Sequence, residues 1–247
     1  MKTTITRALR DRLLVVGEVL DTEQVTPRMR KIRIGGEALA GLTWTPGQHV
    51  RLAVNDIFAA RTWLRGEITN ALRTYSIWHH DPTWQTIELI GFDHGGDGPG
   101  TTWIRDARPG QEIAFTKPEG SLVVRPASYH LFAGEETASV AFGAMLRALP
   151  EDEAVFGAVE ADGPGDHLDL PRELTRVCRA GASAASSELL VEAVRKLDLP
   201  AEPGVAYLAG EARTIQAVRA HLVRERGWQR GDVRTKPFWT PGKRGID

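Results

Sequence analysis

Apolar and polar residues alternate along several short runs in the first half of the chain. Within one of these runs, Val50 and Leu52 point to one side of an extended backbone and Arg51 to the other. A period of two residues is typical of β-strands with one buried face. The runs cover residues 28–34, 48–54, 73–78 and 85–92. Because turn signals such as Pro46-Gly47 and Asp81-Pro82 separate them, the pattern predicts an antiparallel barrel or sandwich.

The pattern changes after about residue 125, where strand-like runs begin to alternate with helical ones. The predicted strands cover residues 129–133, 154–159, 177–180, 205–209 and 233–239, and the predicted helices cover 135–149, 186–197 and 212–226. Ser183 or Ser186 is expected to cap the second helix. Strands that alternate with helices of this length indicate βαβ units and a mostly parallel sheet. We therefore predict two domains, residues 1–125 and 126–247.

The amino-acid composition and charge exclude several classes of protein. The 247 residues include 42% apolar and 26% charged side chains, with 31 basic and 32 acidic residues and a formal charge of −1. This balance argues against a nucleic-acid or membrane-surface binder. The single cysteine, Cys178, excludes an intrachain disulfide or a cysteine-rich metal site, and no histidine spacing suggests a bound metal. With no signal-like or membrane-spanning apolar run, we predict a cytoplasmic protein without stable membrane association.

The strongest local motif is Arg73-Thr74-Tyr75-Ser76, followed about twenty residues later by a glycine-rich segment, 93–103. On a strand, Arg73 and Tyr75 share a face about 7 Å apart, whereas Ser76 points to the other face unless the strand bends. The glycine-rich segment leads into a predicted short helix at 101–108, whose free backbone donors suit a pyrophosphate. Alternatively, the motif is an ordinary barrel strand with a surface arginine and the glycines form a loop.

The order of these motifs resembles that of the ferredoxin-reductase superfamily, and more closely that of the siderophore-interacting proteins. The strings that carry the resemblance are 46–52, 73–76, 94–103, 107–110, 133–137 and 209–212, together with Arg219. The resemblance implies a six-stranded antiparallel flavin-binding β-barrel. A smaller α/β nucleotide-binding domain with a mostly parallel sheet would follow it.

The resemblance also implies roles for the residues of the first domain. Arg73 would bind an FAD phosphate, Tyr75 would pack on the isoalloxazine, and Ser76 would lie near flavin N5, which makes Tyr75 and Ser76 the catalytic candidates. Trp103 would stack on adenine or, equally well, cover the barrel. The remaining cofactor contacts would come from Thr74, His94, Gly98, Gly100, Thr101 and Thr102.

A predicted NAD(P)H site lies where two strands of the second domain meet helices. Its residues are Gly134, Glu135, Glu136, Thr137, Gly210 and Glu211. The segment lacks the Gly-x-Gly-x-x-Gly pattern, and glutamates at a helix start would repel a pyrophosphate. The resemblance implies that the family shares this departure, so it does not exclude NAD(P)H. The alternative is that Glu135, Glu136 and Glu211 only pair with helix dipoles.

A ferric siderophore is bulky and commonly anionic, so its site is expected to carry basic side chains. Arg51 matches a basic position of the family. At a second one, an aromatic–Trp–basic motif, the chain reads Phe238-Trp239-Thr240, so the basic residue is absent. Lys236, Lys243 or Arg244 would substitute for it, unless Lys243 and Arg244 form a solvated tail. The predicted substrate contacts are Arg51, Lys117, Trp239, Lys243 and Arg244.

The function that the resemblance implies is that of an FAD-dependent reductase, which we expect to be monomeric. It would pass electrons from NAD(P)H through flavin to a ferric siderophore. Release of Fe(II) would serve iron assimilation, since siderophores hold Fe(II) weakly. Two alternatives stay open: a general NAD(P)H- or ferredoxin-coupled flavin reductase, and a carrier that binds flavin or siderophore without catalysis.

Overall fold

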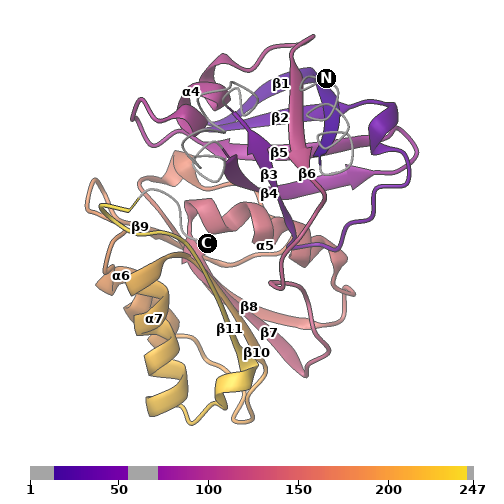
Figure 1. Ribbon diagram of the computed structural model, residues 1–247. Coiled ribbons are helices and arrows are strands. Elements are labelled where there is room, and N and C mark those ends of the chain that lie inside the picture. The colour runs from indigo at the N-terminus through magenta and orange to yellow at the C-terminus, as the bar shows by residue number, and fades with distance from the viewer. Residues whose placement is uncertain (1–13, 55–71, 244–247) are drawn as a thin grey trace. The chain divides into compact units, whose positions relative to one another are not determined.

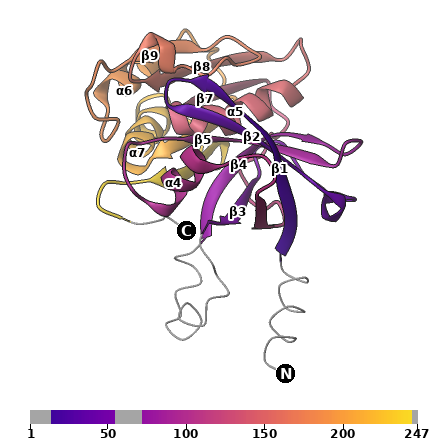
Figure 2. The ribbon, with the colours of Figure 1, turned by 90° about the horizontal axis from the view of Figure 1, so that it is seen from above.

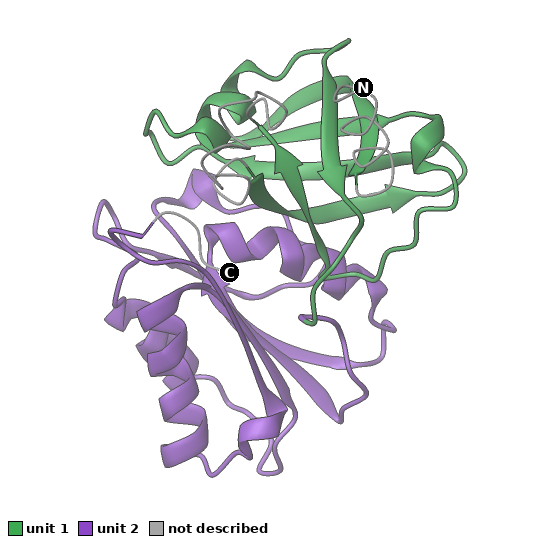
Figure 3. Ribbon diagram, viewed as in Figure 1, with its two compact units in different colours: residues 1–121 green, residues 122–247 purple. Residues whose placement is uncertain are grey.

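The computed structural model describes residues 14–54 and 72–243 of the chain. The chain divides into two compact units, residues 1–121 and 122–247 (Figure 3). The units are nearly equal in length, so the second is not the smaller domain that the sequence led us to expect. Within the described ranges, no helix is long and apolar enough to cross a membrane.

The first unit is a closed antiparallel barrel, which confirms the predicted fold. Its strand order is β1-β2-β5-β4-β3-β6 (Figure 1). The strands are β1 (Leu14–Thr26), β2 (Met29–Gly35), β3 (His49–Ala53), β4 (Leu72–Asp81), β5 (Thr86–Phe92) and β6 (Glu112–Thr116), and the short 3₁₀ helix η1 (Glu37–Leu39) follows β2. The sequence pattern did not predict β1 and β6. β1 was missed because its alternation breaks where the pairing register with β2 shifts between Val19 and Asp21.

A short helix, α4 (Pro99–Asp106), packs against β5 of the barrel (Figures 1 and 2). It starts two residues earlier than predicted, because Pro99 occupies its first position, where a missing N–H costs nothing. The side chains of Trp103 and Ile104 are buried in the barrel core. A Cβ atom at Gly91 of β5 would overlap the side chain of Ile104, so this glycine lets the helix approach the strand closely.

The second unit contains a five-stranded parallel sheet in the order β11-β10-β7-β8-β9, which confirms the predicted α/β class. The strands are β7 (Tyr129–Glu135), β8 (Ala154–Ala161), β9 (Thr175–Cys178), β10 (Val205–Glu211) and β11 (Val233–Trp239). β7 is the first strand of the unit, and later strands add on both of its sides. The order therefore reverses between β7 and β10, and open α/β sheets commonly bind ligands at the carboxyl ends of such strands.

Helices cover both faces of this sheet. They are α5 (Glu136–Ala148), α6 (Glu188–Arg195) and α7 (Ala212–Ala220), with the π-helical turn η3 (His221–Glu225) continuing α7 and the 3₁₀ turns η2 (Pro164–Asp166) and η4 (Arg230–Asp232) in the connections. Successive residues of β7 point to opposite faces: Phe132 packs with Phe142 of α5, and Leu131 packs with Val194 of α6 and Ile215 of α7. Figure 1 shows α5 on one face and α6 with α7 on the other.

The cap of α6 differs from both predicted residues. The hydroxyl of Ser187 accepts a hydrogen bond from the amide of Leu190, at 3.3 Å between oxygen and nitrogen. Ser186 has a backbone φ of 59° and stands before the helix, while the hydroxyl of Ser183 accepts from the amide of Ala185. Sequence alone did not separate these neighbouring serines, because each has the residue type that caps helices.

Candidate functional site

The side chains of Arg73 and Tyr75 lie on the inner face of the barrel. In the β3–β4 pair, Arg73 stands opposite Leu52 and Tyr75 opposite Val50, and both apolar partners are fully buried. Directly opposed residues of antiparallel strands project to the same face of the sheet. The Tyr75 ring continues this packing, since its centroid lies 5.8 Å from that of Trp103 on α4. The two motif residues therefore face α4.

Gly100 brings the start of α4 against these two side chains. The Tyr75 hydroxyl donates a hydrogen bond to the carbonyl oxygen of Gly100 at 3.1 Å. A Cβ atom at position 100 would lie 2.9 Å from Tyr75 Oη and 3.2 Å from Arg73 Cγ, which is tighter than ordinary packing allows. Burial raises the pKa of Tyr75, so its hydroxyl stays protonated and keeps donating. A glycine at this position is therefore what allows the close approach.

The first turn of α4 offers backbone donors to a ligand. Gly98, the N-cap residue, supplies no capping side chain, and the first turn carries no acidic residue. The hydroxyl of Thr101 is 2.6 Å from Nε2 of His94, which joins the glycine-rich loop to the helix. With the positively charged Arg73 beside this turn, the residues fit a phosphate or pyrophosphate. FAD would be held here through its phosphates.

Ser76 and Thr74 lie on the opposite face of β4, as the alternation predicted. Ser76 stands opposite His49 and Thr74 stands opposite Arg51 in the β3–β4 register. The register shift in β4 comes later, between Ile77 and His79, and so leaves this alternation intact. The catalytic candidate Ser76 and the substrate candidate Arg51 therefore share one face of two adjacent strands.

A carboxylate that the sequence analysis missed joins this outer face. Glu119 Oε1 forms a salt bridge with Arg51 Nε at 2.8 Å and lies 3.8 Å from His49 Nε2. The backbones of His49 and Glu119 exchange two hydrogen bonds of 2.9 Å each. Gly120, with φ of +118°, leaves room for the imidazole, because a Cβ there would lie 2.8 Å from His49 Nδ1. Residues far apart in sequence thus form one polar face, and no local sequence motif predicts that they lie together.

In the second unit, the carboxyl ends of β7 and β10 each carry a glutamate that caps the following helix. Glu135 Oε2 accepts from the amide of Thr137 at 2.9 Å. Glu211 Oε2 accepts from the amides of Arg213 and Thr214 at 3.0 and 2.9 Å. Each carboxylate uses backbone donors and adds negative charge at the start of the helix, and both effects disfavour a pyrophosphate there.

The two glycines of the predicted NAD(P)H site serve packing. A Cβ at Gly134 would overlap the carbonyl oxygen of Ala209 on the neighbouring strand. Gly210 has φ of +116°, and a Cβ there would lie 2.6 Å from Oε1 of Glu135. The structure thus brings the predicted residues together at one sheet edge. Their arrangement does not fit a dinucleotide whose pyrophosphate rests on the N-terminus of α5 or α7.

A network of buried charged side chains lies close to the carboxyl ends of β7 and β10. Arg179 binds both carboxylate oxygens of Glu136, with 2.5 Å between Nη1 and Oε2, and its Nη1 lies 3.7 Å from Oε1 of Glu160. Glu160, fully buried, accepts a hydrogen bond from the hydroxyl of Ser187. Burial, and after it the charge of Glu136, raises the pKa of Glu135 to about 7.

The end of β11 is tied to the two capping glutamates. Trp239 Nε1 donates to Glu135 Oε1 at 3.0 Å, and the Thr240 hydroxyl donates to Glu211 Oε1 at 3.3 Å. Burial opposes ionisation of Glu211, but its hydrogen bonds from the backbone outweigh burial and lower its pKa. At the position where the resemblance implied a basic residue, the chain therefore holds a neutral hydroxyl bound to a carboxylate.

The other predicted cations lie at the surface or beyond the described part of the chain. Lys117 and Lys243 are exposed, and Arg244 lies outside the described residues. Among residues 14–54 and 72–243, no group of three or more His, Cys, Asp or Glu side chains is placed to hold a metal ion.

The fold defines a class, the proteins with a ferredoxin-reductase-like fold. Residues 18–122 match the family model of the siderophore-interacting FAD-binding domain, and residues 127–242 match that of the siderophore-interacting protein. The chain belongs to the siderophore-interacting protein family.

Similar proteins cover most of the chain. An uncharacterized protein of Mycobacterium tuberculosis strain H37Rv is 28% identical over 240 residues, covering 85% of this chain and 84% of its own. The ferric vibriobactin reductase ViuB of Vibrio cholerae serotype O1 is 26% identical over 176 residues, covering 69% of this chain and 65% of its own. The crystal structure of a siderophore utilization protein from T. fusca has the same fold, with a TM-score of 0.78, 24% identity and 95% coverage of both chains.

The first prediction concerns Arg73. Arg73→Ala should weaken FAD binding by about 10- to 150-fold, because it removes charge-assisted hydrogen bonds worth about 1.5–3 kcal/mol. Arg51→Ala, on the opposite face of the β3–β4 pair, is the matched control and should retain FAD. Fluorescence titration of the apoprotein with FAD measures both affinities, and circular dichroism checks the fold. Equal FAD affinity of the two variants would count against the phosphate site.

The second prediction concerns Glu135, whose pKa is raised from 4.5 to about 7 in the folded chain. Because the folded state then binds more protons than the unfolded state, this side chain's contribution to stability falls as pH rises from about 4.5 through 7. Relative to Glu135→Gln, the wild type should therefore lose up to about 3 kcal/mol of unfolding free energy between pH 4.5 and 8.

Urea denaturation of the wild type and Glu135→Gln at four pH values measures this difference. The exposed Glu202→Gln serves as the control, and its difference from the wild type should not vary with pH. A wild-type-minus-Glu135→Gln difference that stays constant across the range would show that Glu135 keeps an ordinary pKa.

Proposed function

We propose that the protein is an FAD-dependent reductase of ferric siderophores. The observation that carries this proposal is the uncapped start of α4, held against Arg73 and Tyr75 by Gly100. Ser76 and Arg51 lie on the opposite, outer face of the same strand pair. Membership of the siderophore-interacting family and the likeness to a ferric vibriobactin reductase support the substrate class.

The site residues of the barrel have different roles in the proposed reaction. Arg73 and the first turn of α4 bind the phosphates of FAD, and Tyr75 packs beside them. FAD, when bound, accepts a pair of electrons and returns them singly, which suits reduction of Fe(III) to Fe(II). The Ser76 hydroxyl supplies a hydrogen-bond donor on the same outer face as Arg51, and this face would receive the ferric complex.

The electron donor is the second part of the proposal. The ferredoxin-reductase-like fold suggests NAD(P)H as the electron donor. However, the carboxylates of Glu135 and Glu211 occupy the starts of α5 and α7, where the strand order of the sheet reverses. A dinucleotide would therefore have to place its pyrophosphate elsewhere. This observation favours reduced ferredoxin as a second candidate donor, because a protein donor needs no pyrophosphate site.

An anaerobic assay tests the proposal. The FAD-loaded protein is mixed with one ferric siderophore and, in separate reactions, with NADH, NADPH or reduced ferredoxin, and a ferrous chelator reports Fe(II). At least one donor should give Fe(II) through many turnovers, in amounts that depend on bound FAD. A protein that binds FAD and siderophore without turnover with any donor would be a carrier, and one that does not bind FAD would refute the proposal.

A further inference from the structure

The outer face beside Ser76 carries a cation that is already paired. Arg51 and Glu119 form a salt bridge of 2.8 Å, and their side chains are 32% and 49% exposed. Part of each side chain is therefore open to solvent. The imidazole of His49, nearly buried, approaches the same carboxylate oxygen at 3.8 Å. Any ferric complex that contacts Arg51 on this face also meets the negative charge of Glu119.

We propose that Glu119 is a specificity-determining residue, selecting ferric siderophores of low net charge, of the tris-hydroxamate type, over trianionic tris-catecholate complexes. This inference rests on the proposed function and names the substrate class of the same site. Three hydroxamates neutralise Fe(III), whereas three catecholates leave three negative charges on the complex. Because Glu119 offsets the charge of Arg51, the pair presents little net positive charge to a trianion.

The expected size of the effect follows from Coulomb's law. One negative charge about 8 Å from a trianion in water lowers the encounter and binding constants by roughly three- to tenfold at about 0.01 M salt, and by less as salt rises. A neutral complex feels almost none of this repulsion. Removing the charge of Glu119 should therefore help only the trianionic substrate.

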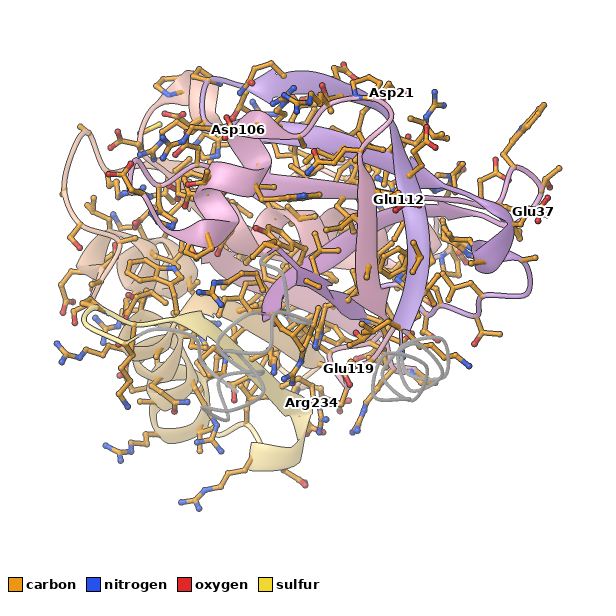
Figure 4. The ribbon with its side chains drawn as sticks, turned by 45° about the horizontal axis from the view of Figure 1, so that its top comes forward. Asp21, Glu37, Asp106, Glu112, Glu119 and Arg234 are labelled. Atoms are coloured by element: carbon orange, nitrogen blue, oxygen red, sulfur yellow. The ribbon has the colours of Figure 1, made fainter. Side chains whose placement is uncertain are left out.

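The test compares the wild type with Glu119→Gln, which keeps the size of the side chain. Glu37→Gln is the matched control, because Glu37 is also an exposed acid of the barrel unit but lies far from Glu119 in Figure 4. The FAD-loaded proteins are reduced with dithionite. Stopped-flow absorbance then follows their oxidation by a neutral ferric tris-hydroxamate and by a trianionic ferric tris-catecholate, each at low and high salt.

Binding of the redox-inert Ga(III) forms of both complexes gives a readout that does not depend on electron transfer. The wild type should bind the neutral Ga(III) complex more tightly than the trianionic one. Glu119→Gln should raise both the affinity and the oxidation rate for the trianionic complex about three- to tenfold at low salt, and change those for the neutral complex by less than about twofold. Glu37→Gln should change neither.

The outcomes separate this inference from the function on which it rests. If Glu119→Gln alters both complexes equally, or neither, or behaves like Glu37→Gln, the role of Glu119 is wrong while reductase function stands. Tighter wild-type binding of the trianionic Ga(III) complex would also overturn it. If neither ferric complex oxidises the reduced protein and neither Ga(III) form binds, the proposed function and the inference both fail.

Discussion

The first turn of every α-helix leaves backbone N–H groups that need an acceptor, and the way this chain supplies acceptors determines where it can bind an anion. In the second unit, Glu135 and Glu211 accept from the first turns of α5 and α7. In the barrel unit, α4 begins at a glycine without a capping side chain and without an acid in its first turn. We therefore propose that the start of α4 binds phosphate, although the sheet of the second unit has the topology that usually receives nucleotides.

The same glutamates shape the sheet edge that they occupy. Burial of the Glu135 carboxyl requires glycine at position 210, and its second oxygen holds the indole of Trp239. Thr240 is held in the same way by Glu211. A buried, bonded carboxylate is costly to remove, because the donors around it would lose their acceptor. At this edge both glutamates therefore already have hydrogen-bond partners within the fold.

Much of this arrangement could be predicted from the sequence. Period-two alternation predicted four of the six barrel strands, and the spacing of Arg73, Tyr75 and Ser76 predicted which side chains share a face. Other features depend on contacts that local patterns do not encode. The pairing of Glu119 with Arg51 joins residues on different elements, and the choice of Ser187 as a cap over its neighbours depends on backbone conformation. The glutamates at 135 and 211 were expected near helix starts, but only the structure shows their side chains capping the helices.

The central claim, that α4 and Arg73 hold an anion, is tested most directly by comparing the affinities of the apoprotein for FMN and riboflavin. These two flavins differ only by a phosphate, so their difference in affinity measures the contribution of that group. Charge-assisted hydrogen bonds from Arg73 and the backbone predict that FMN binds at least about tenfold more tightly than riboflavin. Equal affinities for the two flavins would contradict the account, because the start of α4 would then contribute nothing to binding.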